Sequence, residues 1–197
     1  LELAELGKGS VSPNPMVGCV IVYQDKIIGE GYHQVFGASH AEVNAVNSVE
    51  NQELLNQSTA YVTLEPCSHQ GRTGPCCDAL IAAGIKKVVA SIADPNPLVS
   101  GQGFARLRAA GIEVEVGPGA AESRELNIGF FSRMIRRTPW VRMKMAASLD
   151  GTTALANGQS QWITSPGARA DGHAWRARAC AVLTGIGTVL EDNPRLD

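Results

Sequence analysis

The chain has 197 residues, of which 44% are hydrophobic and 18% are charged, which suits one or two globular domains with buried cores. A formal net charge of -2 offers no overall basic surface to nucleic acid, and no run of about 18 apolar residues is present that could span a membrane. Five cysteines are an odd number, and a chain of this size does not need disulfides. We therefore expect reduced thiols in a cytoplasmic protein, with Cys19 and Cys180 buried because both lie in apolar runs.

The first two thirds of the chain alternates between patterns typical of strands and of helices. Apolar, β-branched runs predict strands, and a proline at the start with a glycine at the end frames a helix. In chain order we expect strands 16–22 and 27–33, helix 40–49, strand 59–65, helix 75–84, strand 86–92, helix 101–111, strand 112–116 and helix 120–137. This order predicts an α/β domain, residues 1–137, built around a mainly parallel sheet.

A second domain is expected over residues 138–197. Pro139 disfavours helix at Thr138, and a new strand is predicted over 140–151. Ser165 followed by Pro166 is a typical helix start, which predicts helix 165–179, and residues 181–187 read as a further strand. Fewer than 60 residues are few for an α/β domain, so we expect this domain to be truncated.

Three short motifs carry the chemistry. His40-Ala41-Glu42 opens a predicted helix, Pro66-Cys67 closes a predicted strand, and Pro75-Cys76 opens the next helix. An H-x-E motif followed by P-C-x-x-C is typical of zinc-dependent deaminases. Two thiolates and one imidazole give zinc three protein ligands and leave the fourth tetrahedral position to water. The Glu42 carboxylate then carries protons. Cys77 and His69 remain competing ligands, and we prefer Cys76 because a proline precedes it, as at Cys67.

The spacing between the two cysteines is unusual. Eight residues, SHQGRTGP, separate Cys67 from Cys76, where other zinc deaminases have two. Arg72 lies between glycine-rich neighbours in this insert, and its guanidinium matches the oxygens of a phosphate group. A solvated loop arginine is the alternative that the residues alone leave open.

Six segments, in order, resemble the family of bifunctional riboflavin-biosynthesis deaminase/reductases. They are SPNPMVGCVIV, GEGYH, HAEVNA, AYVTLEPCSHQGRTGPC, ASIADPNPLVSGQG and MKMAASLDGTTA. The resemblance covers nearly the whole chain. It implies a cytidine-deaminase-like three-layer α/β/α domain, followed by the start of a dihydrofolate-reductase-like α/β domain. It also implies hydrolytic deamination of 2,5-diamino-6-(5-phosphoribosylamino)pyrimidin-4(3H)-one at C2 and NADPH-dependent reduction of the ribosyl group to ribityl. A homo-oligomer with no nucleic-acid or membrane partner is expected.

The resemblance also assigns roles to residues. It implies that zinc is bound by His40, Cys67 and Cys76, and that Glu42 is the proton shuttle. The implied substrate contacts of the deaminase are Asn14, His33, His69, Arg72, Asp94 and Asn96. In the reductase part, the implied NADPH contacts are Ala146, Trp162, Thr188 and Asp192, and the implied substrate contacts are Ser160, Arg176 and Leu196.

The sequence departs from the family pattern at Gly74, where the family usually has a proline, and we expect glycine to loosen the loop without removing a ligand. Two other functions are compatible with the motifs. One is a deaminase that acts on nucleosides or RNA bases, which the acidic charge balance and the long insert disfavour. The other is a zinc-stabilised binding module, which would not need a carboxylate at Glu42.

Overall fold

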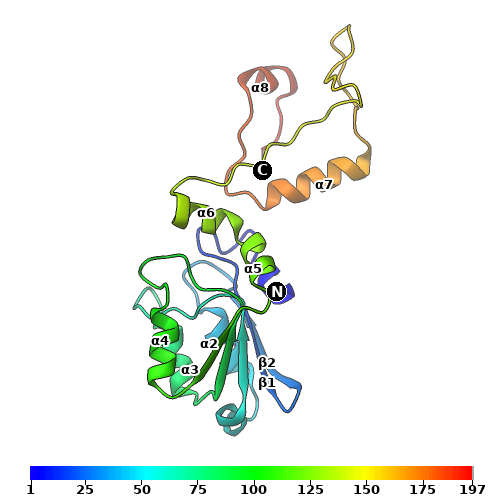
Figure 1. Ribbon diagram of the computed structural model, residues 1–197. Helices are drawn as coiled ribbons and strands as arrows, with labels where there is room; N and C mark the ends of the chain where they lie inside the picture. The colour runs from blue at the N-terminus through cyan, green and yellow to red at the C-terminus, as the bar shows by residue number, and fades with distance from the viewer. Residues whose placement is uncertain (197) are drawn as a thin grey trace. The chain divides into compact units, whose positions relative to one another are not determined.

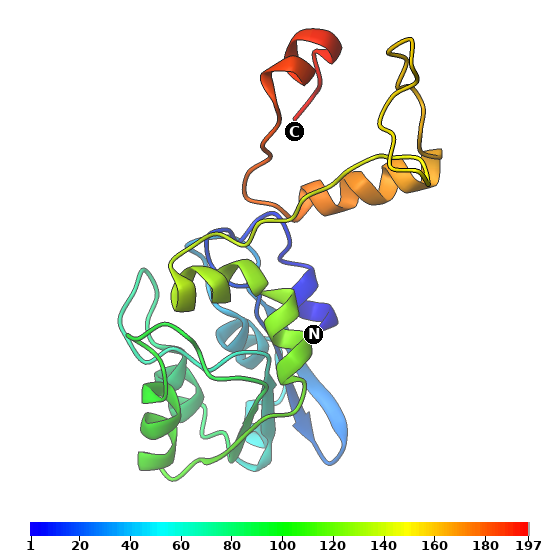
Figure 2. The same cartoon turned by 45° about the horizontal axis from the view of Figure 1, so that its top comes forward.

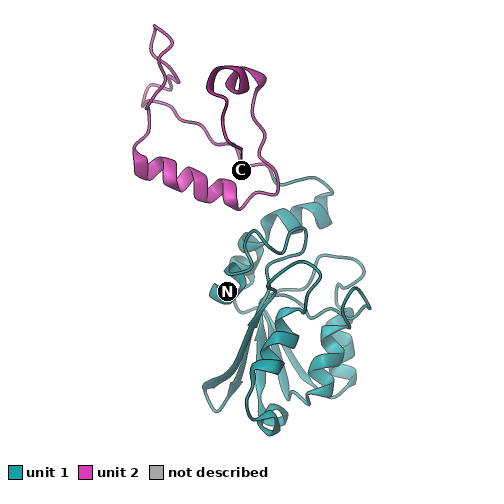
Figure 3. Cartoon of the chain, turned by 180° about the vertical axis from the view of Figure 1, so that it is seen from behind, with its two compact units in different colours: residues 1–140 teal, residues 141–197 magenta. Residues whose placement is uncertain are grey.

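The structure is a computed structural model and describes residues 1–196. The chain divides into two compact units, Leu1–Trp140 and Val141–Asp197 (Figure 3). Within the described residues, none of the helices has the length and apolar character needed to cross a membrane.

Unit 1 is built on a five-stranded sheet with the order β2-β1-β3-β4-β5 (Figure 1). The strands are β1 (Gly18–Tyr23), β2 (Lys26–Tyr32), β3 (Thr59–Val62), β4 (Lys87–Ala90) and β5 (Glu113–Val116). β1 pairs antiparallel with β2 and with β3, whereas β3, β4 and β5 run parallel. The sheet is therefore mixed, and the expectation of a mainly parallel sheet was wrong, because β1 pairs antiparallel with β3 as well as with β2, its partner in the hairpin.

Helices cover both faces of this sheet. They are α1 (Glu2–Glu5), α2 (Ala41–Ser48), α3 (Cys76–Ala82), α4 (Gln102–Ala109), α5 (Ala120–Leu126) and α6 (Ile128–Arg136), with a 3-10 turn at Gln52–Gln57. A Cβ added at Gly18 would meet the backbone of α1, whereas one added at Gly31 would meet the backbone of α2. Gly18 pairs with Tyr32, and Gly31 with Cys19, the next residue of β1. Because neighbouring strand residues face opposite ways, α1 and α2 lie on opposite faces, which confirms the three-layer architecture (Figure 2).

The main core lies between the sheet and α2, α3 and α4. Fully buried members include Ile21 of β1, Ala45 of α2, Leu80 of α3, Val88 of β4 and Leu107 of α4. These side chains come from the sheet and from the three helices on one of its faces, so the core fixes the ends of β3 and the starts of α2 and α3 relative to one another. The predicted zinc motifs lie at these ends.

Two glycine-to-alanine changes are expected to have opposite effects on stability. In Gly31→Ala, the new Cβ would lie 2.3 Å from the Ala45 amide nitrogen and 2.4 Å from the Ala41 carbonyl oxygen, so we expect a loss of about 3 kcal/mol or more. At Gly74 a Cβ meets nothing within 4 Å and φ lies outside the left-handed region, so Gly74→Ala should gain about 0.4–1 kcal/mol. Urea unfolding of both variants measures the difference, and equal effects would contradict the packing described here.

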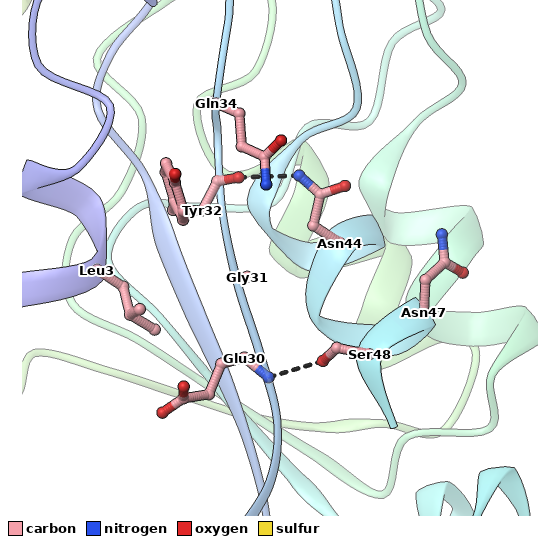
Figure 4. A pocket seen from close by; sticks show the side chains of 8 residues that line it. All are labelled: Leu3, Glu30, Gly31, Tyr32, Gln34, Asn44, Asn47 and Ser48. Carbon is pink, nitrogen blue, oxygen red and sulfur yellow. Dashed lines mark hydrogen bonds between the residues drawn. The ribbon is translucent and has the colours of Figure 1, made fainter. Parts of the chain in front are cut away.

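The edge strand β2 is covered by side chains of α2. Ser48 Oγ accepts a hydrogen bond from the Glu30 amide at 2.8 Å, and Asn44 Nδ2 donates to the Tyr32 carbonyl oxygen at 2.8 Å (Figure 4). A cavity of about 440 Å³ lies beside these contacts, lined by Leu3, Glu30, Gly31, Tyr32, Gln34, Asn44, Asn47 and Ser48. Two backbone groups of this edge strand, the Glu30 amide and the Tyr32 carbonyl oxygen, are therefore bonded to α2 and not available for pairing with another strand.

The predicted helix 120–137 is two helices in the structure. α5 ends and α6 begins at Asn127, which has φ -111° and ψ 27°. Its side chain accepts a hydrogen bond from the Met16 amide and donates one to the Met16 carbonyl oxygen, both at 2.8 Å. This pair of bonds ties the break to the segment before β1, a contact between residues 111 positions apart that the local pattern cannot reveal.

Unit 2 contains two helices, α7 (Pro166–Ala177) and α8 (Ile186–Asp192). Ser165 caps α7 by accepting a hydrogen bond from the Ala168 amide at 3.2 Å, as expected. The strands predicted over 140–151 and 181–187 are absent from the described residues. A strand needs a neighbour for its backbone bonds, and the described part of this unit supplies none. Cys180 is exposed, so its predicted burial was wrong, whereas Cys19 is buried as expected.

Candidate metal centre

Three side chains from three element ends converge in unit 1. His40 precedes α2, Cys67 follows β3, and Cys76 is the first residue of α3. His40 Nδ1 lies 3.1 Å from Cys76 Sγ and 3.6 Å from Cys67 Sγ, and all three ligand atoms lie within 4.8 Å of one another. Zn–S bonds of about 2.3 Å and Zn–N bonds of about 2.0 Å would place such donors roughly 3.5 Å apart around a tetrahedral ion. The cluster therefore fits zinc by donor type and by spacing.

The loop between the two cysteines is closed at its base by backbone contacts. The Cys76 amide donates to Cys67 Sγ at 3.3 Å, and the Cys77 amide donates to the Cys67 carbonyl oxygen at 3.1 Å. The first amide belongs to the N-terminus of α3, whose partial positive charge favours a thiolate. The insert thus leaves the sheet and returns to the same point, which keeps both sulphur atoms beside His40.

Proton sharing at the cluster matches a metal-binding set of donors. A hydrogen bond from the Cys76 thiol, with a further one from His40, lowers the pKa of Cys67 to about 4 against the opposing effect of burial. The same shared proton and burial raise the pKa of Cys76. The Cys67 hydrogen bond raises the pKa of His40. Of the two thiols, Cys67 therefore loses its proton more readily, and the thiolate is the form of cysteine that binds a metal.

The two competing ligands lie outside the cluster. The Cys77 thiol donates to the carbonyl oxygens of Pro66 at 3.3 Å and Gly103 at 3.5 Å, inside the core. Burial raises the pKa of this thiol to about 12, which suits a structural cysteine. His69 is exposed and does not belong to the group of ligand atoms that lie close together. The geometry therefore favours Cys76 over both.

Glu42 lies in the first turn of α2 and is only 3% exposed. Burial raises the pKa of its carboxyl to about 7, and the negative charge of Cys67 adds to the rise. A carboxyl with a pKa near neutrality both accepts and releases a proton at physiological pH, which is the property of a general acid–base group.

The predicted contact residues Asn14 and His33 meet beside the metal cluster. Asn14 Nδ2 and His33 Nε2 are 3.3 Å apart, and the His33 ring lies edge-on to the His40 ring with centroids 5.1 Å apart. His33 is buried, and this burial lowers its pKa. The structure therefore brings together the segment before β1, the end of β2 and a predicted zinc ligand.

The insert presents two further predicted residues to solvent. His69 and Arg72 are both exposed, and the Arg72 guanidinium stacks over the Phe36 ring, with 4.7 Å from Cζ to the centroid. Phe36 was not identified from the sequence, because a single phenylalanine in a loop has no distinctive pattern. This contact orients the Arg72 side chain without neutralising the charge of its guanidinium group.

Asp94 and Asn96 lie in a compact turn after β4. Asp94 Oδ1 accepts from the Asn96 amide at 2.7 Å, and Asn96 Oδ1 accepts from the Leu98 amide at 3.1 Å. Asp94 is buried and Asn96 half-buried. The Asp94 amide donates a hydrogen bond to Glu65 Oε2 at 3.1 Å, and because Glu65 lies two residues before Cys67, this turn is near the cluster.

Asp94 should make stability depend on pH. Burial raises the pKa of its carboxyl from 3.8 to about 6, against the Asn96 hydrogen bond. The folded protein therefore holds this proton more tightly than the unfolded chain, and stability falls as pH rises from about 4 to about 6. We expect Asp94→Asn to be more stable than the parent by on the order of 1–2 kcal/mol near pH 7.5 and equal near pH 4. Urea unfolding across this range tests it, and a difference independent of pH would contradict it.

Glu65 is a buried carboxylate that the local sequence pattern identifies only as the end of a strand. It is 3% exposed and accepts hydrogen bonds from four backbone amides of residues 94–104. Its position directly before Pro66-Cys67 was the only available signal.

The residues predicted for the reductase part lie on separate segments of unit 2. Ala146 is half-buried in a segment without regular structure, Trp162 is 70% exposed beneath the Arg169 guanidinium, and Thr188 and Asp192 are exposed on α8. Ser160 is exposed, and Arg176 on α7 donates to the Arg195 carbonyl oxygen, next to Leu196. The structure thus places Arg176 near Leu196, and the roles of all seven stay predictions.

Both parts of the chain are similar to known proteins. Residues 1–92 match the family model of the cytidine and deoxycytidylate deaminase zinc-binding region, and residues 139–197 match that of the RibD C-terminal domain. The chain is 55% identical to the riboflavin biosynthesis protein RibD of Escherichia coli over 196 residues, which cover 100% of this chain and 53% of the relative. It is 50% identical to RibD of Aquifex aeolicus, covering 100% and 54%. The chain spans about half the length of the curated relatives it matches.

Solved structures give the same result. A structure of RibD from Acinetobacter baumannii matches with a TM-score of 0.92 and 52% identity, covering 99% of this chain and 54% of that one. A Thermotoga maritima structure, described as a diaminohydroxyphosphoribosylaminopyrimidine deaminase/5-amino-6-(5-phosphoribosylamino)uracil reductase, matches with a TM-score of 0.92 and 45% identity, covering 98% and 55%. With a deaminase-type zinc cluster in its first unit and the start of the RibD C-terminal domain in its second, the chain belongs to the RibD family of riboflavin biosynthesis proteins.

Proposed function

We propose that unit 1 is a zinc-dependent hydrolytic deaminase acting in riboflavin biosynthesis. The observation that carries this proposal is the cluster of His40, Cys67 and Cys76 with the buried carboxyl of Glu42 two residues after the histidine. The proposed substrate is 2,5-diamino-6-(5-phosphoribosylamino)pyrimidin-4(3H)-one, which agrees with the description of the similar Thermotoga maritima structure as a diaminohydroxyphosphoribosylaminopyrimidine deaminase.

The reaction exchanges an amino group for oxygen. Zinc, when bound, supplies Lewis acidity that makes a water molecule nucleophilic at neutral pH. As the oxygen of the water bonds to C2, Glu42 accepts a proton from the water. Glu42 then donates this proton to the ring nitrogen next to C2. The bond from C2 to the amino nitrogen then breaks, a second proton passes through Glu42 to that nitrogen, and ammonia leaves with a carbonyl at C2. The pKa of about 7 at Glu42 suits both transfers.

The surrounding residues supply contacts for the rest of the substrate. Arg72, exposed and stacked on Phe36, offers a guanidinium to the phosphate, and His69 lies on the same insert. Asn14 and His33 lie beside the cluster. Asp94 and Asn96 offer hydrogen-bonding groups from the turn after β4. These six residues are the proposed substrate contacts of the deaminase.

The proposal is tested by incubating the zinc-loaded chain with the phosphoribosylated diaminopyrimidine, with cytidine and with an adenosine-containing transfer RNA. We expect ammonia release from the first alone. Turnover of cytidine or RNA without turnover of the diaminopyrimidine would assign a different deaminase. Release from none of the three would favour a zinc-binding module without catalysis.

We further propose that residues 138–197 contribute to an NADPH-dependent reductase that converts the ribosyl group of the deaminated product to ribityl. The match of residues 139–197 to the RibD C-terminal domain supports this. Ala146, Trp162, Thr188 and Asp192 are the proposed cofactor contacts, and Ser160, Arg176 and Leu196 the proposed substrate contacts. Quenching of Trp162 fluorescence by NADPH, lost in Trp162→Phe, is the measurement that tests the cofactor part.

The proposed setting is cytoplasmic, where thiols stay reduced and available to zinc, and the proposed assembly is a homo-oligomer. Sedimentation analysis of the purified chain measures the assembly directly.

A further inference from the structure

The Glu65 carboxylate takes no part in the chemistry proposed above, yet it is buried beside the metal cluster and fully used in hydrogen bonding. Oε2 accepts from the amides of Asp94 at 3.1 Å and Gly101 at 3.0 Å. Oε1 accepts from the amides of Gly103 at 3.0 Å and Phe104 at 3.3 Å. A buried carboxylate is tolerated only with such partners, and each of these four comes from the backbone.

The four amides belong to the two ends of one loop. Asp94 begins the turn after β4, Gly101 is the N-cap of α4, and Gly103 and Phe104 are the second and third residues of that helix. Amides at these helical positions have no partner within the helix. Gly101 provides no side-chain cap, so Glu65 caps α4 from another part of the chain. The positive end of the helix dipole also favours its charge.

The same junction is tightly packed and reinforced on both sides of Cys67. A Cβ at Gly103 would lie 2.1 Å from the Pro66 carbonyl oxygen, so α4 approaches this segment as closely as a glycine allows. Arg106 of α4 donates to the Ser68 carbonyl oxygen at 3.0 Å and pairs with Asp78 of α3 at 2.7 Å. Residues 65–68, which include a predicted zinc ligand, are thus held to α4 at each end.

We propose that Glu65 is a positioning residue that fixes the loop 93–101 relative to the zinc ligand Cys67. The loop carries Asp94 and Asn96, and Cys67 follows Glu65 by two residues, so one carboxylate sets the separation between substrate contacts and metal. This inference rests on the proposed deaminase function, since the substrate roles of Asp94 and Asn96 come from it.

The test compares the zinc-loaded parent chain with Glu65→Gln, which leaves one acceptor oxygen and turns an NH₂ group toward two amide donors. Glu53→Gln, at an exposed glutamate, is the matched control. We expect KM for the diaminopyrimidine substrate to rise about tenfold in Glu65→Gln, with kcat changed by less than about threefold, because binding contacts rather than the reacting groups are displaced. Bound zinc should stay at the parent level, and the control should match the parent.

A second readout does not depend on activity. Amide hydrogen exchange should become about tenfold faster or more in peptides covering 93–104 of Glu65→Gln, with β4 (Lys87–Ala90) unchanged. Glu65→Asp keeps the charge on a shorter side chain, so it should show the same changes at smaller size if Glu65→Gln does not fold. Unchanged KM in whichever variant folds, loss of zinc, or exchange that accelerates uniformly would overturn the proposal. If the parent itself released no ammonia, the proposed function would fail, and exchange in 93–104 would still decide whether Glu65 holds the loop.

Discussion

Replacing Glu42 with glutamine is expected to lower kcat for ammonia release by about 10³-fold or more while zinc remains bound. The amide matches the carboxyl in shape but cannot carry a proton from water to the ring nitrogen and on to ammonia, and such transfers contribute about 10²–10⁴ to a rate. The buried position of Glu42 and its pKa of about 7 leave few other groups to take over. Coupled detection of ammonia, with zinc measured on the same samples, gives both quantities.

Glu53→Gln is the control for this variant, because it makes the same chemical change at an exposed glutamate on the 3-10 turn. It should retain parent activity. Full activity of Glu42→Gln would rule out the proton-shuttle role and with it the proposed mechanism. Loss of zinc along with activity would instead show that Glu42 supports the metal cluster.

Exchanging each of the two adjacent cysteines for serine should separate the metal ligand from its neighbour. In Cys76→Ser the cluster loses a sulphur that lies 3.1 Å from His40 Nδ1, and we expect zinc affinity to fall by at least about 100-fold, since even outer contacts of a metal site are worth 10–100-fold. Deamination should disappear with the metal. Zinc stoichiometry after dialysis against a weak chelator measures the effect.

Cys77→Ser should keep zinc and activity. Its thiol donates to the Pro66 and Gly103 carbonyl oxygens, and a serine hydroxyl donates to the same acceptors, so the change costs about 1–2 kcal/mol of stability from lost packing alone. Zinc lost from Cys77→Ser but retained by Cys76→Ser would reverse the assignment. Zinc lost from both would mean that Cys77 holds the start of α3 in place.

The metal cluster could be predicted from the sequence because each ligand lies at the end of an element that local patterns reveal. His40 precedes a helix, Cys67 follows a strand, and Cys76 begins a helix after a proline. Because β2 and β3 both run antiparallel to β1, they point the same way, and the residues that follow them lie at one edge of the sheet. Because successive helical residues point in different directions, only one of Cys76 and Cys77 is expected to bind, and Cys76 could be preferred because a proline precedes it, as at Cys67.

The parts that escaped prediction depend on distant partners. Glu65 receives its hydrogen bonds from amides 29 to 39 residues later, and the break at Asn127 depends on Met16. In unit 2 the apolar segments around Val141 and Leu183 resemble strands, but both side chains are exposed, at 79% and 98%. A strand-like apolar pattern shows that a segment is compatible with a β-strand. The segment forms a strand only where a neighbouring strand can pair with its backbone groups.

The closed base of the insert also separates the geometry of the metal cluster from the sequence of the insert. The amides of Cys76 and Cys77 bind the Cys67 sulphur and carbonyl oxygen, so the chain leaves and re-enters the metal cluster at one fixed point. Residues 68–75 therefore form a segment whose two ends are fixed by contacts at its base and not by its own sequence. Changes in the length or composition of this segment, which includes the proposed phosphate contact Arg72, should therefore leave the two sulphur atoms of the metal cluster in place.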